Sequence, residues 1–164
     1  MQGEMNFVID GGKKLSGKVE TSRSKNGAVA LLAASLLNRG RTTLLNVPKI
    51  EEVNRLIEVL RSIGVSVEWQ NNNLKIITGD ISLEKIDRVA ATKTRSILMF
   101  IGPLLHLFKK FELPQSGGCT LGLRSVRPHL LALEKFGVNI EATSDTYRVT
   151  HTKLTPTEVV LYES

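Results

Sequence analysis

The sequence contains few of the residues on which several classes of protein depend. Its 164 residues include one cysteine, which excludes a disulfide bond within the chain. Aromatic residues make up 5% of it, too few for the stacking surface of a single-strand nucleic-acid binder. The longest apolar runs, residues 28–37 and 97–108, are shorter than the roughly 20 residues of a membrane-spanning helix. The sequence therefore predicts neither a disulfide framework nor a membrane span.

Familiar cofactor and targeting motifs are also missing from the sequence. It has no His-Glu-x-x-His, no cysteine pair and no cluster of carboxylates, and the glycines of residues 117–122 lack the lysine of a phosphate-binding P-loop. The first residues have neither the charged start nor the apolar run of a signal peptide. We expect a cytoplasmic protein whose chemistry needs no metal and no cofactor.

The remaining composition is that of a globular protein with an excess of positive charge. Hydrophobic residues make up 41% and charged residues 23%, and 164 residues suit one domain. The net charge of +6 points to anionic partners, which include nucleic acid, acidic lipid and phosphorylated substrates. Lysine and arginine are scattered as singles or pairs such as Lys13-Lys14, so no basic stripe is visible. A small phosphorylated substrate is favoured over nucleic acid or a membrane.

Hydrophobic periodicity predicts an α/β fold. Glu51, Glu52, Arg55, Glu58 and Arg61 take the solvent face of one amphipathic helix that ends at Gly64. The predicted strands are 7–9 and 18–21, which open the chain as a hairpin, then 42–46 and 110–113, with further hairpins over 65–77 and 138–149; the predicted helices are 25–37, capped by Ser22 to Ser24, then 50–63, 93–108 and 126–136.

The chain is predicted to repeat one structural unit. Residues 64–68, Gly-Val-Ser-Val-Glu, match residues 137–141, Gly-Val-Asn-Ile-Glu, at a spacing of 73. We expect units of β-α-β-α-β-β order over 6–78 and 80–151, and the start of a third over 157–164, where Glu158 to Tyr162 is β-prone. A third unit would be incomplete, so residues 1–164 are expected to be part of a larger domain.

The second unit is predicted to contain an insertion around the cysteine. Pro114 stands seven positions further before Gly137 than Pro48 stands before Gly64, which predicts seven extra residues before the second helix. They include Gly117-Gly118-Cys119, and glycines allow a thiol to stand on an open loop. Because the first unit manages without them, a functional role is favoured, although a lone cysteine also serves as a small buried hydrophobe.

Several basic residues are candidates for binding an anion. Lys25 and Asn26 begin a helix, where unpaired backbone N–H groups favour a carboxylate or phosphate. Arg95 precedes an apolar helix, and Arg124 and Arg127 follow the cysteine loop, where they also favour a thiolate. Each also has a plain structural explanation: a solvated lysine after a helix cap, a helix-start arginine in water, or a basic surface turn.

His129 is a weaker candidate, because it stands where the first unit has an apolar residue, Leu56. A half-buried structural histidine and a catalytic one are both compatible with this position.

Four motifs together resemble one known family. They are Ser24-Lys25-Asn26 before an Ala/Leu-rich helix, Asn46-Val47-Pro48, Arg95 followed by Gly102-Pro103-Leu104, and Gly118-Cys119-Thr120-Leu121-Gly122-x-Arg124 with His129. The chain is similar over its whole length to the enolpyruvyl transferases, and within them to the members that act on UDP-N-acetylglucosamine. The resemblance implies an inside-out α/β barrel built from such units, of which residues 1–164 form an incomplete N-terminal part.

The resemblance also implies a reaction and its residues. The enolpyruvyl group of phosphoenolpyruvate would pass to the 3-hydroxyl of UDP-N-acetylglucosamine, the first committed step of peptidoglycan synthesis, without metal or cofactor. Lys25 and Asn26 would contact phosphoenolpyruvate and the sugar, Arg95 the nucleotide sugar, and Cys119 would donate a proton and assist product release. The segment around uridine and phosphoenolpyruvate would be Arg124, Ser125, Val126, Arg127 and Pro128.

The chain departs from the family in two motifs and in length. Ser116 stands where the family has proline before Gly-Gly-Cys, and Arg127 stands where it has an acid that contacts uracil. The family's second domain, with a catalytic acid and further arginines, would be needed as a partner, so the isolated chain is expected to be inactive. A shikimate-pathway enolpyruvyl transferase and a non-catalytic module for nucleotide sugars or anions are the alternatives.

Overall fold

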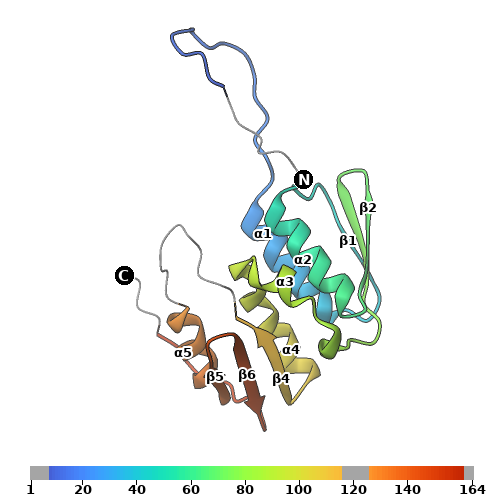
Figure 1. The fold of residues 1–164 in the computed structure, drawn as a ribbon, viewed down its shortest axis with the longest axis vertical. Helices are drawn as coiled ribbons and strands as arrows, with labels where there is room; N and C mark the ends of the chain where they lie inside the picture. The colour runs from blue at the N-terminus through green and yellow to red at the C-terminus, as the bar shows by residue number, and fades with distance from the viewer. Residues whose placement is uncertain (1–7, 116–125, 161–164) are drawn as a thin grey trace.

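The computed structural model describes residues 8–115 and 126–160, whose helices and strands form two groups, each with its own sheet (Figure 1). This mixture of helices and strands confirms the predicted α/β class. The first group contains α1 (Lys25–Ala34), η1 (Ser35–Leu37), β1 (Arg41–Leu44), α2 (Glu51–Ser62), β2 (Ser66–Gln70) and β3 (Asn73–Ile77). The second contains η2 (Leu83–Lys85), α3 (Arg88–Thr92), η3 (Arg95–Phe100), α4 (Ile101–Leu107), β4 (Lys110–Pro114), α5 (Arg127–Lys135), β5 (Val138–Ala142) and β6 (Thr146–His151).

The two sheets have the same antiparallel topology. Their strand orders are β1-β3-β2 and β4-β6-β5, so the last strand of each group lies in the middle. Ser66 pairs with Ile77 in the first sheet, and the residues that follow them at the repeat spacing, Asn139 and Thr150, pair in the second. Sheet order and hairpin register thus repeat at the spacing expected from the sequence, while the unit boundaries at 6–78, 80–151 and 157–164 stay predictions.

The strand register also measures the insertion that precedes α5. Leu44 of β1 pairs with Leu74, and Leu113 of β4 pairs with Tyr147. Because Tyr147 follows Leu74 at the repeat spacing, their partners Leu44 and Leu113 occupy equivalent places in the two sheets.

The insertion is four residues long by this register. Leu113 stands four positions further before Gly137 than its equivalent, Leu44, stands before Gly64. The count of seven was wrong because it aligned two prolines that are not equivalent. Pro114 lies inside β4 and pairs with Thr146, whereas Pro48 lies beyond the end of β1.

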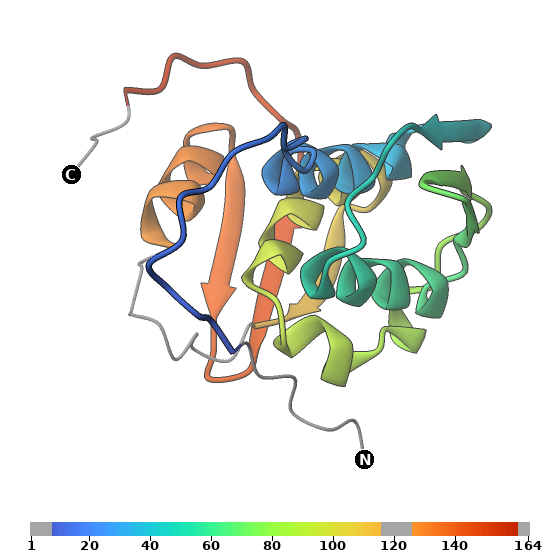
Figure 2. The same ribbon diagram turned by 90° about the horizontal axis from the view of Figure 1, so that it is seen from above.

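One hydrophobic core joins the two groups. In the first group α1 packs against α2, and in turn these helices pack against η3 and α3 of the second group (Figure 2). The fully buried side chains come from both groups and include Leu32, Leu56, Leu60, Phe100 and Leu104. Burial of these helices therefore fixes the segment that begins at Arg95 relative to α1 and α2. No helix in residues 8–115 or 126–160 is both long and apolar enough to cross a membrane.

The single helix expected over 93–108 is wrong, because the chain forms α3, η3 and α4 in succession. Thr94 starts a new turn, since its Oγ1 accepts a hydrogen bond of 3.1 Å from the N–H of Ser96. Pro103 has no N–H to donate to the carbonyl of Met99, so an α-helix cannot continue unbroken through this point. The segment from Arg95 to Phe100 forms a 3₁₀ helix instead.

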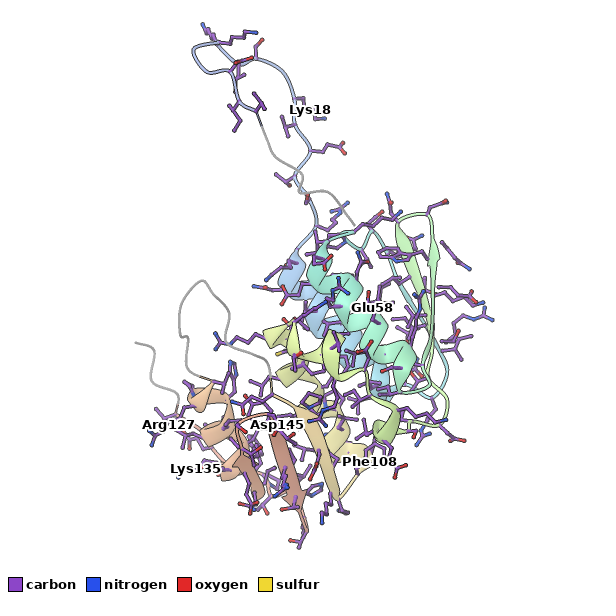
Figure 3. The ribbon with its side chains drawn as sticks, in the orientation of Figure 1. Lys18, Glu58, Phe108, Arg127, Lys135 and Asp145 are labelled. Carbon is purple, nitrogen blue, oxygen red and sulfur yellow. The ribbon has the colours of Figure 1, made fainter. Side chains whose placement is uncertain are left out.

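The opening hairpin over 7–9 and 18–21 is also not formed. Residues 8–24 contain no strand and extend away from the helices, with Lys18 on the outer part of the loop (Figure 3). Val8, Ile9 and Val19 are 91%, 86% and 89% exposed. β-prone residues become a strand only when another strand pairs with them, and within the described part of the chain none does. Phe7 lies outside the described residues.

The β-prone start of a third unit is likewise not a strand where the structure describes it. Residues 156–160 have no regular secondary structure, and Leu161 and Tyr162 lie outside the described residues. This segment follows β6 but pairs with neither described sheet.

A glycine ends the helix before each hairpin. Gly64 and Gly137 have φ angles of 100° and 86°, a backbone conformation that residues with a Cβ rarely adopt. After each hairpin the chain returns to that helix end, where the N–H of Ser82 donates to Ile63 at 3.0 Å and that of Thr155 donates to Phe136 at 2.9 Å. Both bonds repeat at the same spacing as the hairpins, so this return is a shared feature of the two groups.

Replacing Gly64 by alanine is expected to lower the free energy of unfolding by about 1–3 kcal/mol. The added Cβ would strain the backbone at φ 100° and lie 2.8 Å from the carbonyl oxygen of Asp80. Urea unfolding followed by circular dichroism measures the change. Gly79→Ala is the matched control, because nothing lies within 4 Å of a Cβ there. Equal unfolding midpoints for the two variants would show that the positive φ and the nearby Asp80 oxygen do not require glycine at position 64.

Candidate functional site

Lys25 and Asn26 lie in the first turn of α1. Ser24 caps this helix, because its Oγ accepts a 3.1 Å hydrogen bond from the N–H of Gly27. This confirms the cap expected from the sequence. Both Lys25 and Asn26 are exposed, while Ala28 and Val29 in the next turn are buried and hold the helix on the core. An ammonium and an amide are therefore displayed at the positive end of an anchored helix.

The ammonium of Lys25 has a specific partner. Its Nζ lies 2.5 Å from Oε2 of Glu52, a residue of the first turn of α2. The other oxygen of the same carboxylate, Oε1, accepts hydrogen bonds from the hydroxyl of Thr94, at 3.2 Å, and from that of Ser96. Glu52 was expected on the face of the helix opposite the packed one, but its side chain is 22% exposed and contacts residues of α1 and of the segment around η3.

Opposing effects act on the Glu52 carboxylate. Burial raises its pKa, but hydrogen bonds from Lys25, Ser96 and Thr94 and the charge of Lys25 together lower it below the ordinary value of 4.5. Because folding lowers this pKa, the charged carboxylate stabilises the fold fully at pH values above the ordinary pKa of 4.5. That contribution is lost as the pH falls through the lowered pKa. At neutral pH Glu52 is therefore an anion that faces the ammonium of Lys25.

Arg95 stands between the two residues that bond to the same carboxylate. It begins η3 and is half-buried, and its neighbours Thr94 and Ser96 are the two hydroxyl donors to Glu52. Burial raises the pKa of Tyr147 in β6, and the positive charge of Arg95 acts in the opposite direction. The structure thus brings the Arg95 segment and Lys25 to one place, between the two groups of elements.

The residues predicted after the cysteine loop lie on a different helix. Val126 is the N-cap of α5, and Arg127, Pro128 and His129 are exposed in its first turn. The half-buried interpretation of His129 is therefore wrong. α5 packs on β5, and Arg127 and Lys135 lie on it in Figure 3. Cys119, Arg124 and Ser125, together with Ser116, lie outside the described residues.

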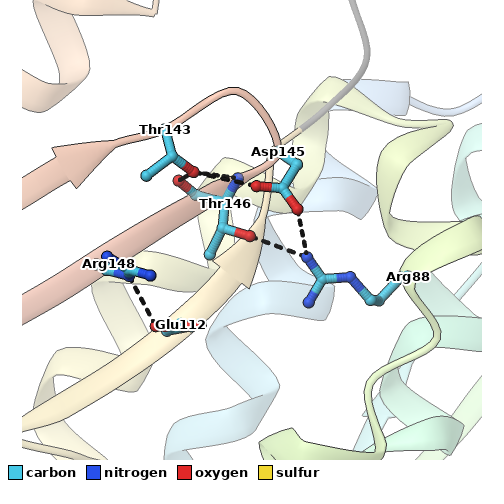
Figure 4. Close-up of polar contacts among 6 residues, drawn as sticks. All are labelled: Arg88, Glu112, Thr143, Asp145, Thr146 and Arg148. Atoms are coloured by element: carbon cyan, nitrogen blue, oxygen red, sulfur yellow. Dashed lines mark hydrogen bonds and ion pairs between the residues drawn. The ribbon is translucent and has the colours of Figure 1, made fainter.

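The chain is firmly held just before the segment that contains the cysteine. The N–H of Gln115 donates to the carbonyl of Asp145 at 2.7 Å. Arg88 of α3 donates to Oδ2 of Asp145 at 3.3 Å and to Oγ1 of Thr146 at 2.9 Å (Figure 4). These bonds tie the β5–β6 turn to α3 and to the residue that follows β4, so Gln115 is held relative to α3.

The larger of two recesses in the described part of the chain lies away from Lys25 and Arg95. A recess of about 560 Å³ is lined by Ile81, Leu83, Ile86 and Phe108 and by charged side chains that include Arg88. It contains none of the site residues expected from the sequence. A smaller groove of about 260 Å³, mostly apolar, runs between α5 and residues 158–160 and includes Pro128. Neither recess contains Lys25 or Arg95.

Glu52 is the residue that sequence reasoning missed. It is distant from Lys25 in the sequence and joins no recognisable motif. The only available signal was its place in the first turn of a helix, a place that acidic residues also occupy for the sake of the helix dipole alone.

Comparison with known proteins identifies the relatives of this chain. The family profile described as EPSP synthase (3-phosphoshikimate 1-carboxyvinyltransferase) matches residues 9–161. A protein of Campylobacter hominis named UDP-N-acetylglucosamine 1-carboxyvinyltransferase is 41% identical over 152 residues, which are 92% of this chain and 36% of that protein. A protein of the same name from Bradyrhizobium diazoefficiens is 37% identical over 138 residues, 84% of this chain and 32% of that protein.

Solved structures have the same fold at lower identity. The enolpyruvyl transferase NikO of Streptomyces tendae superposes with a TM-score of 0.71 over 89% of this chain and 32% of its own, at 23% identity. EPSP synthase of Acinetobacter baumannii gives a TM-score of 0.64 over 90% of this chain and 35% of its own, at 19% identity. The chain spans about a third of the length of these proteins. The resemblance drawn from its motifs is confirmed: the chain belongs to the EPSP synthase family of enolpyruvyl transferases.

Proposed function

We propose that the complete protein transfers the enolpyruvyl group of phosphoenolpyruvate to the 3-hydroxyl of UDP-N-acetylglucosamine. The observation that carries the proposal is the 41% identity, over 92% of the chain, to a relative named for this activity. The solved EPSP synthase, named for the shikimate-pathway reaction, is 19% identical, which favours the nucleotide sugar as acceptor. On this proposal the protein acts in the cytoplasm and commits the sugar to peptidoglycan.

The proposed reaction proceeds by addition and elimination. The sugar 3-hydroxyl loses its proton to a base as its oxygen bonds to C2 of phosphoenolpyruvate, and C3 gains a proton from an acid, which gives a tetrahedral intermediate. C3 then loses a proton, the C2–C3 double bond forms again, and phosphate leaves C2 with its electron pair. Both substrates are anions, so the site needs several positive charges already in place, and neither step requires a metal or a redox cofactor.

Within this chain we assign the anion-binding part of the site to α1 and η3. Lys25 and Asn26 would contact phosphoenolpyruvate and the sugar, and Arg95 would contact the nucleotide sugar. The ion pair of Lys25 with Glu52 and the bonds of Glu52 to Thr94 and Ser96 support a common location for these cations. The segment from Arg124 through Ser125, Val126 and Arg127 to Pro128 would serve uridine and phosphoenolpyruvate.

The rest of the site would come from a second domain of the longer protein. This chain spans about a third of its relatives, and Lys25 is 53% exposed, as a residue at the edge of a shared site would be. We therefore expect phosphate release from the complete protein and none from residues 1–164 alone.

The decisive assay measures phosphate release from phosphoenolpyruvate by the complete protein with each of two acceptors. Release with UDP-N-acetylglucosamine supports the proposal, and release with shikimate 3-phosphate instead would replace it by the shikimate-pathway reaction. Binding of UDP-N-acetylglucosamine without any release would identify a non-catalytic binding module. Buffer without acceptor gives the background rate.

Cys119 is proposed as the proton donor, and it is expected to react with fosfomycin, an epoxide phosphonate, when UDP-N-acetylglucosamine is present. The thiolate would attack an epoxide carbon, the C–O bond would break, and the released oxygen would take a proton. Mass spectrometry of the peptide that contains Cys119 detects the adduct, and Cys119→Ser is the control. A complete protein that stays unlabelled with sugar nucleotide present would remove Cys119 from the mechanism.

A further inference from the structure

Glu52 contacts side chains from two other segments at once. Its Oε2 faces the ammonium of Lys25 on α1 at 2.5 Å, and its Oε1 accepts from the hydroxyls of Thr94 and Ser96. These two hydroxyls stand on either side of Arg95 in the sequence. A single carboxylate therefore links the residue proposed to bind phosphoenolpyruvate to the segment proposed to bind the nucleotide sugar.

The carboxylate is well placed to act as a fixed point. Val53 and Leu56, on the same helix, are completely buried, so α2 cannot shift without disturbing the core. Thr94 is 4% exposed, and its hydroxyl also accepts from the N–H of Ser96. Lys25, by contrast, is 53% exposed and has a flexible four-carbon side chain whose ordering costs conformational entropy.

The ion pair leaves the ammonium able to bind a substrate. An ammonium has three N–H donors, and Glu52 occupies one of them. A phosphate or carboxylate that approaches from the solvent side would meet the remaining donors of a lysine whose position is already set. Preorganised donors of this kind contribute more to a transition state than donors that must first be ordered.

A role in helix stability alone does not explain these contacts. Glu51 lies in the same first turn and has the same charge, so it interacts with the dipole of α2 equally well. Its carboxylate, however, is 73% exposed and accepts from Arg55 of its own helix at 2.7 Å. Glu51 and Glu52 thus have the same charge in the same helical turn, but Glu51 contacts its own helix whereas Glu52 contacts two other segments.

We propose that Glu52 is a positioning residue, which holds the ammonium of Lys25 and the Thr94–Ser96 segment, with Arg95 in it, at a fixed separation. It acts through these groups and does not itself contact substrate. The proposal rests on the function proposed above for the complete protein, because that function supplies the anions that Lys25 and Arg95 would bind.

Glu52→Gln in the complete protein tests the proposal. Glutamine keeps the volume and can still bond to the hydroxyls, but it no longer attracts the ammonium. We expect kcat/KM for phosphoenolpyruvate to fall about 10- to 100-fold, as for a displacement of a reacting group by about 1 Å. Glu51→Gln should change it less than about twofold. Glu52→Asp should recover part of the loss, because it restores the charge at shorter reach.

A second readout does not depend on turnover. An ion pair with a carboxylate protects a lysine nitrogen from acylation by acetic anhydride, and mass spectrometry compares the rate at Lys25 with that at the exposed Lys153. Loss of the ion pair should raise the relative rate at Lys25 about two- to fivefold in Glu52→Gln and leave it unchanged in Glu51→Gln.

The outcomes separate the two proposals. A wild-type protein that releases no phosphate with UDP-N-acetylglucosamine contradicts the proposed function, while the acylation rates still decide whether Glu52 holds Lys25. Active wild-type protein with equal kcat/KM in Glu52→Gln and Glu51→Gln overturns the positioning role, and so does an unchanged acylation rate at Lys25. Thermal unfolding of each variant verifies that it is folded.

Discussion

Lys25→Met is expected to lower kcat/KM for phosphoenolpyruvate in the complete protein by about 10²- to 10³-fold, the usual effect of removing one preorganised donor from a transition-state site. The substitution keeps the length and apolar part of the side chain but removes the ammonium that lies beside Glu52. Initial rates of phosphate release, measured against phosphoenolpyruvate at saturating UDP-N-acetylglucosamine, give this value.

Lys153→Met is the matched control for Lys25, because Lys153 is an exposed lysine in the segment after β6. It removes the same charge at a distance from α1 and should leave the kinetics unchanged within about twofold. Since Lys25 is 53% exposed, its ion pair adds at most about 1 kcal/mol to the free energy of unfolding, so both variants should stay folded. Wild-type kinetics in Lys25→Met would show that α1 does not bind the anion.

Phe100→Ala is expected to have the largest effect on stability, with a loss of about 3–5 kcal/mol in the free energy of unfolding. Phe100 is completely buried at the end of η3, where it contributes to the core shared by both groups. Truncation would leave a cavity at the junction between η3 and α4. Chemical denaturation monitored by circular dichroism measures the loss.

The adjacent Met99 provides the control for Phe100. It belongs to the same 3₁₀ helix but is 43% exposed, so Met99→Ala removes little buried surface. We expect a change below about 1 kcal/mol for it. A similar loss in both variants would mean that the helix itself, rather than burial of Phe100, determines the stability of this segment.

Hydrophobic periodicity predicted the fold well where a helix or strand is amphipathic. α2 and the two hairpins lie close to their expected bounds, because one face of each is buried against the core. Periodicity failed over residues 8–24, since β-prone side chains do not specify a partner strand. It also failed over 93–108, where the cap at Thr94 and the missing N–H of Pro103 divide an apolar run into separate turns.

The candidate site was only partly predictable for a different reason. Lys25 was accessible to sequence reasoning because its signal is local, a serine cap followed by a cation at a helix start. Glu52 was not, because its role depends on a contact with a residue far away in the sequence and on the position of η3. Pairing of β4 with β6, another long-range contact, likewise corrected the length of the insertion before α5.

The central position of the last strand has a consequence for the order of folding. β1 and β2 both pair with β3, so the hydrogen-bonded ladders of the first sheet begin at residue 73 and are complete only after residue 77 has been synthesised. The apolar faces of α1 and α2 become fully buried only later, because η3 and α3, which follow in the sequence, cover part of them. A nascent chain paused between the two groups would hold a finished sheet with incompletely covered helices, a state prone to aggregation. Rapid translation from residue 77 to residue 100 would therefore favour a high yield of folded protein.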